Sequence, residues 1–344
     1  MSTTVAVAQP KKMWGQPPST VLNDDLGATA KARRERRRAL IVPREHGAWG
    51  LLLVPMITGA GVAFRQSFHV LPFLLLLTGA LALFCLRTPV ESLLGTSAMR
   101  AQTKDERQTL AAAVGALGAV AAIALGSLLW AGHNPYLWLI GLGAGICFAA
   151  QSLLKLKSTS KLMWRQLPRL SRETLPRASA ASPGGKAEWP RSRHSTRQLR
   201  MLSEVVGTIG LTASAPSAYY VITGKLGLTA WVLWLANLLF AGDQIHYVQL
   251  RLHTVRIAGL RAKLAQGWSF AVGQAALTVV LTLAGIAGLM PEFASLAFAP
   301  LLFRGWFYFI QKPAPLLVRR LGWSELSHAV AFCILFIAVF VLPR

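Results

Sequence analysis

Long runs of apolar, uncharged residues recur along this chain and limit what it can fold into. An α-helix rises about 1.5 Å per residue, so about 20 residues cross the roughly 30 Å hydrocarbon core of a bilayer. Only 14% of the 344 residues are charged, whereas a soluble globular domain carries about 25%. Nine such stretches can be delimited, at residues 47–64, 70–87, 109–131, 135–154, 202–223, 227–247, 267–288, 292–311 and 324–342.

The secondary structure of these stretches follows from the chemistry of lipid. Hydrocarbon offers no hydrogen-bond partner to a backbone N–H or C=O group, so a spanning segment must be a helix or part of a closed barrel. The stretches lack the sustained alternation of polar and apolar residues that barrel strands show. We therefore predict an all-α, polytopic membrane protein with about nine transmembrane helices.

The basic residues predict an orientation for these helices. The chain has 36 Lys and Arg against 13 Asp and Glu, and cytoplasmic loops of membrane proteins are enriched in Lys and Arg. With the N-terminus inside, the cytoplasmic pieces are 1–46, 88–108, 155–201, 248–266 and 312–323. These pieces, together with Arg87 at the end of the second span, contain every basic residue of the chain except four. The four are Arg65, Lys225, Arg304 and Arg344. We expect a multi-pass protein of a bacterial plasma membrane, with its C-terminus outside.

Two polar segments lie outside the spans. Residues 1–40 carry a dense run of arginines, and we expect a disordered cytoplasmic arm that lies on anionic lipid headgroups. Residues 155–200 are rich in Ser, Pro and Arg, and we expect a mobile basic insertion in the transmembrane domain of 41–344. Neither segment has the interleaved aromatic residues typical of nucleic-acid binding, so nucleic acid is not an expected partner.

Ionisable residues in or near the spans gather at the cytoplasmic end, which predicts a polar cavity open to that side. Arg304 lies within an apolar stretch and needs a carboxylate, a carbonyl or an anionic ligand as partner. Arg87 and Arg251 could instead extend to the headgroups from span ends. The three cysteines lie inside apolar runs without metal-ligand spacing, so no metal site is expected from them.

Two segments concentrate this chemistry. Residues 43–50 read Pro-Arg-Glu-His-Gly-Ala-Trp-Gly and place three polar side chains at the start of the first span. In the sixth span, spacings of three and four residues put Asp243 and His246 on one helical stripe. Such groups can exchange a proton or hold an anionic head. The candidate catalytic residues are Glu45, His46, Asp243 and His246, and the candidate substrate-binding residues are Arg44, Arg87, Arg251 and Arg304.

These segments resemble the YwiC-like family of bacterial membrane proteins. The resemblance rests on residues 43–50, on Ser-Glu-Val-Val-Gly-Thr-Ile-Gly-Leu at 203–211 with Ala-Pro-Ser-Ala-Tyr-Tyr at 215–220, on the sixth span, and on Arg-Arg-Leu-Gly-Trp-Ser-Glu at 319–325. It covers roughly residues 40–342 without the insertion. The family implies an integral membrane protein and adds no established activity.

A more distant resemblance is to the UbiA-type intramembrane prenyltransferases. It rests on nine helices, an inside N-terminus and the block with Trp234, Phe240, Asp243 and Tyr247, which is similar to their sixth helix. It implies a UbiA-like helical bundle with two Asp-rich motifs that hold Mg²⁺ against a diphosphate. This sequence departs from that pattern, because Arg87 and Arg251 stand where those motifs would fall. The departure disfavours Mg²⁺, and no other cofactor is expected.

Three functions are consistent with these features. The first is a UbiA-like transferase or other enzyme acting on an amphipathic, phosphorylated substrate taken from the bilayer. The second is a transporter or binder of a small anion or lipid. The third is a non-catalytic assembly partner of a membrane complex, whose protein partners the sequence does not identify. The one-sided polar cavity favours the first.

Overall fold

A computed structural model describes residues 31, 34–41, 46–95, 97, 101–131, 136–173, 192–312 and 315–341. These residues form helices and connecting turns, and none of them lies in a strand. Eight helices are long and apolar enough to cross a membrane, and a ninth, Gly47–Ala63, is apolar but shorter. The prediction of an all-α, polytopic membrane protein is confirmed.

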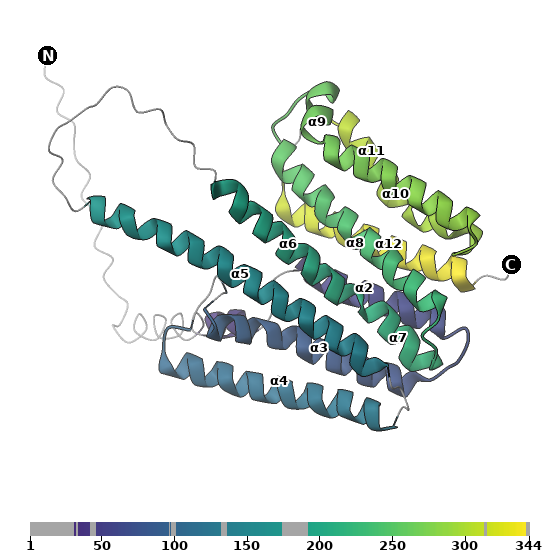
Figure 1. Ribbon diagram of the computed structural model, residues 1–344, viewed down its shortest axis with the longest axis horizontal. Coiled ribbons are helices and arrows are strands. Elements are labelled where there is room, and N and C mark those ends of the chain that lie inside the picture. The colour runs from purple at the N-terminus through teal and green to yellow at the C-terminus, as the bar shows by residue number, and fades with distance from the viewer. Residues whose placement is uncertain are drawn as a thin grey trace, which may run out of the picture.

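Each predicted stretch coincides with a helical segment (Figure 1). Seven are single helices: α2 (His46–Ala63), α3 (Val70–Leu93), α4 (Lys104–Ala131), α5 (Leu137–Glu173), α8 (Leu228–Thr254), α10 (Trp268–Ile286) and α12 (Val318–Val341). The fifth stretch is divided into α6 (Ser192–Thr212) and α7 (Ser214–Thr223), and the eighth into the 3₁₀ helix η1 (Glu292–Phe298) and α11 (Ala299–Ile310). A short helix that the apolar pattern did not predict, α9 (Leu260–Gln266), connects α8 to α10.

The break between α6 and α7 brings α7 close to α2. Pro216 lies in the first turn of α7, where its missing N–H leaves no helical hydrogen bond unmade. A Cβ added to Gly59 would lie 2.1 Å from the carbonyl oxygen of Ala215, so only glycine permits this approach. The Ser214 hydroxyl donates to the carbonyl oxygen of Leu52 over 3.0 Å, which ties the two helices together.

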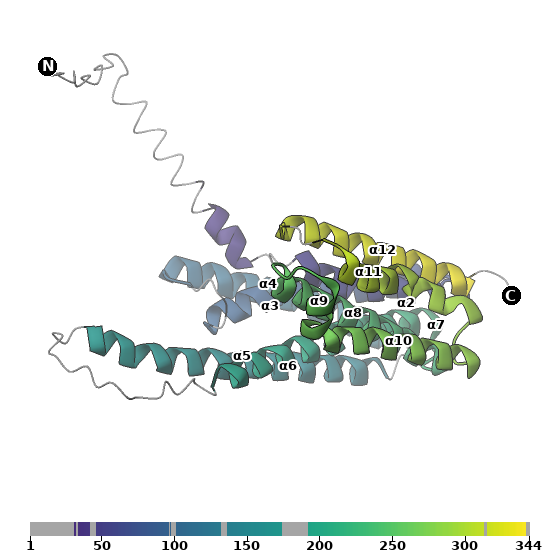
Figure 2. The ribbon, with the colours of Figure 1, turned by 90° about the horizontal axis from the view of Figure 1, so that it is seen from above.

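The helices run side by side and neighbours are mostly antiparallel (Figures 1 and 2). The close neighbours are α3 with α4, α5 with α6, α2 with α7, and α12 with α2 and η1. Phe240 of α8 stacks on Phe332 of α12 with ring centroids 4.2 Å apart, and Phe298 of η1 packs edge-on against Phe332. This aromatic contact joins the elements that position the candidate site.

The two polar segments are helical where the structure describes them. Within the predicted arm, residues 34–41 form a short helix, and residues 1–30, 32 and 33 lie outside the described residues. Helix α5 extends to Glu173 and α6 begins at Ser192, so the expected insertion contains the ends of two helices. Residues 174–191 lie outside the described part of the chain.

Candidate functional site

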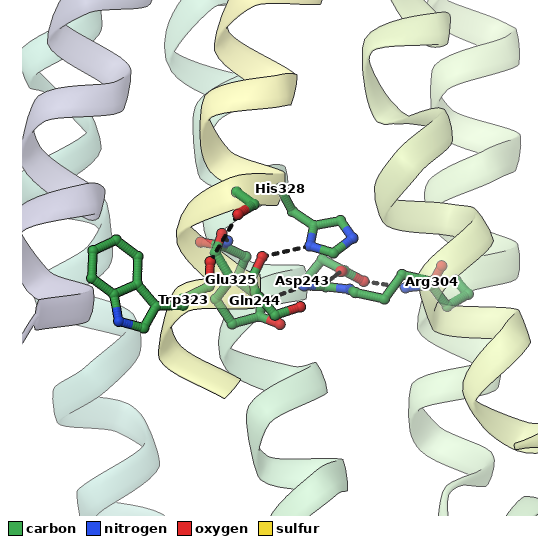
Figure 3. Close-up of polar contacts among 9 residues, drawn as sticks. Asp243, Gln244, Arg304, Trp323, Glu325 and His328 are labelled. Atoms are coloured by element: carbon green, nitrogen blue, oxygen red, sulfur yellow. Dashed lines mark hydrogen bonds and ion pairs between the residues drawn. The ribbon is translucent and has the colours of Figure 1, made fainter. Parts of the chain in front are cut away.

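Arg304 lies between two carboxylates at the meeting point of α8, α11 and α12 (Figure 3). One terminal nitrogen, Nη2, is 3.2 Å from Oδ2 of Asp243. The other, Nη1, donates to Oε2 of Glu325. The exposed fractions of the three side chains are 7% for Arg304, 7% for Asp243 and 13% for Glu325. This charge cluster supplies the partner that an arginine in an apolar span requires.

The three residues lie at a similar height in the bundle. Arg304 is about 9 Å along its helix from the C-terminal end of α11, and Glu325 is about 10 Å from the N-terminal end of α12. Asp243 is about 16 Å from the C-terminal end of α8. These helix ends lie at the same end of the bundle (Figure 1), so the cluster lies within the spans but nearer to that end.

Neighbouring side chains hold the cluster in place. The amide Nε2 of Gln274 on α10 donates to Oδ1 of Asp243. A Cβ added to Gly305 would lie 2.8 Å from Cδ of Gln274, so the glycine provides the room for this amide. The guanidinium carbon of Arg304 lies 4.0 Å from the ring centroid of Tyr247, a cation–π contact.

The α12 side of the cluster is held through the backbone. Gln244, next to Asp243 on α8, donates from Nε2 to the carbonyl oxygen of Glu325 over 2.9 Å. His328 lies one turn further along α12 and contacts the Ser324 carbonyl oxygen through Nδ1 at 2.6 Å. It also interacts electrostatically with Glu325. Figure 3 shows Asp243, Gln244, Arg304, Glu325 and His328 gathered between these helices.

The charges and hydrogen bonds of the cluster are not fully balanced. With both carboxyl groups ionised, two negative charges face one positive charge. Three buried atoms of the group have no hydrogen-bond partner among the described residues, namely Arg304 Nε, Gln274 Oε1 and Glu325 Oε1. A buried polar group without a partner costs about 1–3 kcal/mol. The cluster is therefore suited to receive a proton or the hydrogen-bonding group of a ligand.

A second group of cations surrounds Tyr308, between the cluster and the end of the bundle. Arg251 and Lys263 lie 4.9 Å and 4.6 Å from the centroid of the Tyr308 ring. Lys263 is almost fully buried and donates to the Gln311 carbonyl oxygen over 2.6 Å. Burial, and then the charge of Arg251, lower the pKa of Lys263. Tyr247 packs edge-on against Tyr308 with centroids 5.8 Å apart, which connects this group to Arg304.

The predicted site residues do not all meet. Asp243 and Arg304 are in direct contact, and Arg251 lies nearby across the two tyrosines. His246 faces α10, where its Nε2 is 3.4 Å from the Ser269 hydroxyl and its ring packs edge-on against Phe270. Arg44 and Glu45 lie outside the described residues, as does the side chain of His46.

Arg87 belongs to a different polar group, between α3 and α5. Its Nε is 3.0 Å from Oε1 of Glu91, and Lys155 Nζ is 2.9 Å from the same oxygen. Trp49, near the start of α2, packs against Phe84 one turn before Arg87, with centroids 4.9 Å apart. The start of α2 therefore lies beside α3 near this group.

The set of predicted site residues omitted Glu325 and Gln274. Glu325 carried a signal, because it is the one acidic residue of the last apolar stretch, but a carboxylate near a helix start is also typical of a helix-dipole interaction. Gln274 is an uncharged residue in an apolar run and carried none. Its role depends on the contact with α8 and α11.

The cluster does not fit a Mg²⁺ ion of the kind that the UbiA resemblance implies. Among the described residues, no three His, Cys, Asp or Glu side chains lie close enough to hold a metal. The space between the carboxylates of Asp243 and Glu325 is taken by the guanidinium of Arg304. We therefore derive no step through a metal at this position.

Residues 42–168 match the family described as YwiC-like protein. The family resemblance is thereby confirmed for the part of the chain that runs from α2 into α5. No curated protein and no solved structure matches the chain. The matched part contains Arg87, Glu91 and Lys155, whereas Asp243, Arg304 and Glu325 lie outside it.

Proposed function

We propose that this membrane protein binds the polar head of a lipid-soluble molecule at the Asp243–Arg304–Glu325 cluster and exchanges a proton with it. The observation that carries the proposal is the sharing of one buried guanidinium between two carboxylates, which leaves an unpartnered Glu325 oxygen inside the spans. In an apolar site a carboxyl group that accepts or releases a proton is an effective acid or base. Arg304 keeps the two carboxyl groups oriented toward each other.

The substrate class follows from the location of the cluster. The helices around it are apolar spans, so the proposed ligand has an apolar tail that lies in the bilayer and a head that would enter between α8, α11 and α12. Arg251 would contact a negatively charged group on that head. Its guanidinium lies against the Tyr308 ring, between the cluster and the end of the bundle. In the proposed orientation this end is cytoplasmic, which is supported by the distribution of basic residues in the loops.

Transfer of a prenyl or related lipid group is the more specific form of this proposal. It is supported by nine apolar helical segments with a polar cluster near one end, and by the position of Asp243 in the block similar to the sixth helix of UbiA-type enzymes. In this form, Arg251 and Arg304 take the place of a metal in neutralising phosphate oxygens, through charge-assisted hydrogen bonds.

Thermal unfolding of the detergent-purified protein tests the proposal. The panel consists of polyprenyl diphosphates, quinones and anionic lipids, each with and without Mg²⁺. A ligand at about 100 times its Kd stabilises the folded state by roughly 2.7 kcal/mol. We expect stabilisation by at least one amphipathic ligand without Mg²⁺, and its loss in Asp243→Asn.

The matched control is Lys312→Gln, which removes a charge from an exposed residue at the same end of the bundle. It should keep the full stabilisation. A ligand effect that survives both Asp243→Asn and the double variant Arg304→Gln/Glu325→Gln would place binding elsewhere. Stabilisation that requires Mg²⁺ would contradict the metal-free form of the proposal.

A further inference from the structure

The helix of residues 34–41 has a basic outer face and a protein-bound inner face. Successive helical residues are separated by about 100°, so Arg36, Ala39 and Leu40 share one side. Ala39 is 7% exposed and Leu40 only 2%. Arg34, Arg37 and Arg38 lie on the opposite side and are exposed.

An ion pair fixes this helix to the start of a membrane span. Nε of Arg36 is 2.6 Å from Oε1 of Glu106, which lies in the first turn of α4. The other carboxylate oxygen, Oε2, accepts the backbone N–H of Gln102 at 2.8 Å. The backbone N–H of Glu106 in turn donates to the Thr103 hydroxyl at 3.2 Å. Glu106 is thus held by the helix start and holds Arg36.

This arrangement brings the outer arginines to the level of the lipid headgroups. Helix α4 is one of the apolar spans, so its first turn lies where the span leaves the hydrocarbon. The helix of 34–41 leaves the bundle beside the ends of α3 and α4 and runs at a steep slant to them (Figure 2). Lys104 and Arg107, at the start of α4, are exposed too. The exposed acidic residues of these two segments are Glu35 and Asp105.

We propose that the helix of residues 34–41 is a membrane-docking surface whose outer arginines bind the phosphate-bearing headgroups of anionic lipids. Each basic residue close to an anionic surface contributes about a fivefold factor to binding. The buried side, with Arg36 and Leu40, keeps the arginines turned outward, so the surface is prearranged for the bilayer. This inference is independent of the Arg304 cluster and of the function proposed for it.

The test uses the full chain with a fluorescent reporter on the outer face. Glu35, which is exposed, is replaced by cysteine, and the cysteine is labelled with an environment-sensitive fluorophore. Protein that keeps Glu35 is treated with the same fluorophore, and its emission gives the background from the native cysteines. The protein is reconstituted in vesicles of phosphatidylcholine, alone or with a third of the lipid as phosphatidylglycerol. We expect a blue shift of the emission in the anionic vesicles that high salt reverses, because salt screens exposed charges.

Removal of the three outer arginines identifies the binding groups. The triple variant R34Q/R37Q/R38Q should lower the ratio of docked to undocked helix about 100-fold and abolish the shift. The matched control, K312Q/R319Q/R320Q, removes three exposed charges from the same end of the bundle and should keep it. Glu106→Gln should reduce the shift while leaving the arginines in place, since it weakens the attachment of the helix to α4.

Three outcomes would overturn the inference. The first is equal emission in neutral and anionic vesicles. The second is an unchanged shift in R34Q/R37Q/R38Q, since the shift would then come from other charges. The third is a response to a nucleic-acid duplex added to neutral vesicles with none to phosphatidylglycerol, which would assign the surface to nucleic acid. Thermal unfolding of each variant, performed in parallel, separates loss of docking from loss of fold.

Discussion

Arg304 of α11 and Asp243 of α8 are 61 residues apart in sequence, yet their side chains meet at 3.2 Å inside the apolar spans. Glu325 of α12 completes the contact from the other side. A buried ion pair contributes little net stability compared with apolar residues, but removal of one partner leaves an uncompensated charge. The cluster is therefore more consistent with a functional role than with a need for stability, and it makes sharp predictions about paired substitutions.

Replacement of Arg304 alone should destabilise the protein strongly. Arg304→Gln leaves two carboxylates facing each other, and loss of one partner from a buried pair costs about 3–5 kcal/mol. In the double variant Arg304→Gln/Glu325→Gln, Asp243 is the only carboxyl group left of the pair, and it becomes neutral when it takes up a proton. The double variant should therefore recover part of the lost stability. Thermal unfolding in one detergent measures both. Equal stability of the single and double variants would contradict the shared ion pair.

Gly305→Ala should disturb the cluster without changing any charge. The new Cβ would lie 2.8 Å from Cδ of Gln274, so the amide must move away from Asp243. Overpacking of this kind costs about 1–3 kcal/mol. The matched control is Gly242→Ala, next to Asp243, where an added Cβ meets nothing within 4 Å. That change should be neutral or slightly stabilising, because alanine is the better helix former. Similar losses in both variants would contradict the role given to Gly305.

Much of this architecture could be predicted from the sequence because the bilayer imposes length and polarity on each span. All nine stretches are helical segments in the structure, and Pro216 lies in the first turn after the break that separates α6 from α7. The short helix α9 carried no comparable signal, because it lies outside the spans and is only seven residues long.

Prediction of the site was less complete, since its members come from four helices. The apolar surroundings of Arg304 indicated that it must have a partner, but spacing within one helix cannot identify a partner on another. Gln274 becomes recognisable only when α10 and α11 are placed around α8, and the sequence alone does not distinguish Glu325 from a carboxylate that interacts with a helix dipole. For the same reason, Arg87 was grouped with Arg304, although the structure places it with Glu91 and Lys155.

Lys263 should give the protein a stability that rises with pH in the alkaline range. Burial and the charge of Arg251 lower its pKa from the usual 10.5. Between the lowered value and 10.5 the unfolded chain binds more protons than the folded protein, so raising the pH through this window favours the folded state. Below the lowered pKa, Lys263 is charged in both states, and the destabilisation of the folded protein by this buried charge is fully present. Thermal unfolding of the protein and of Lys263→Met across this range compares the pH dependence of their stabilities. Equal pH dependence in the two proteins would mean that Lys263 has an ordinary pKa.

The two polar groups should act independently, although both contain arginines from span ends. The Arg87–Glu91–Lys155 group joins α3 to α5, whereas the Arg304 cluster lies on α8, α11 and α12. Substitutions at separate sites without shared partners usually add to within about 0.5 kcal/mol. The stability losses of Glu91→Gln and Glu325→Gln should therefore sum in the double variant, as measured by thermal unfolding.

The same pair of variants separates the two groups by function. If the proposed ligand binds at Arg304, Glu325→Gln should weaken stabilisation by that ligand, and Glu91→Gln should leave it unchanged. A coupling energy well above 0.5 kcal/mol, or a loss of ligand stabilisation in Glu91→Gln, would mean that one substrate contacts both groups. The arginines predicted together from the sequence would then line one site, reached from the part of the chain that matches the YwiC-like family.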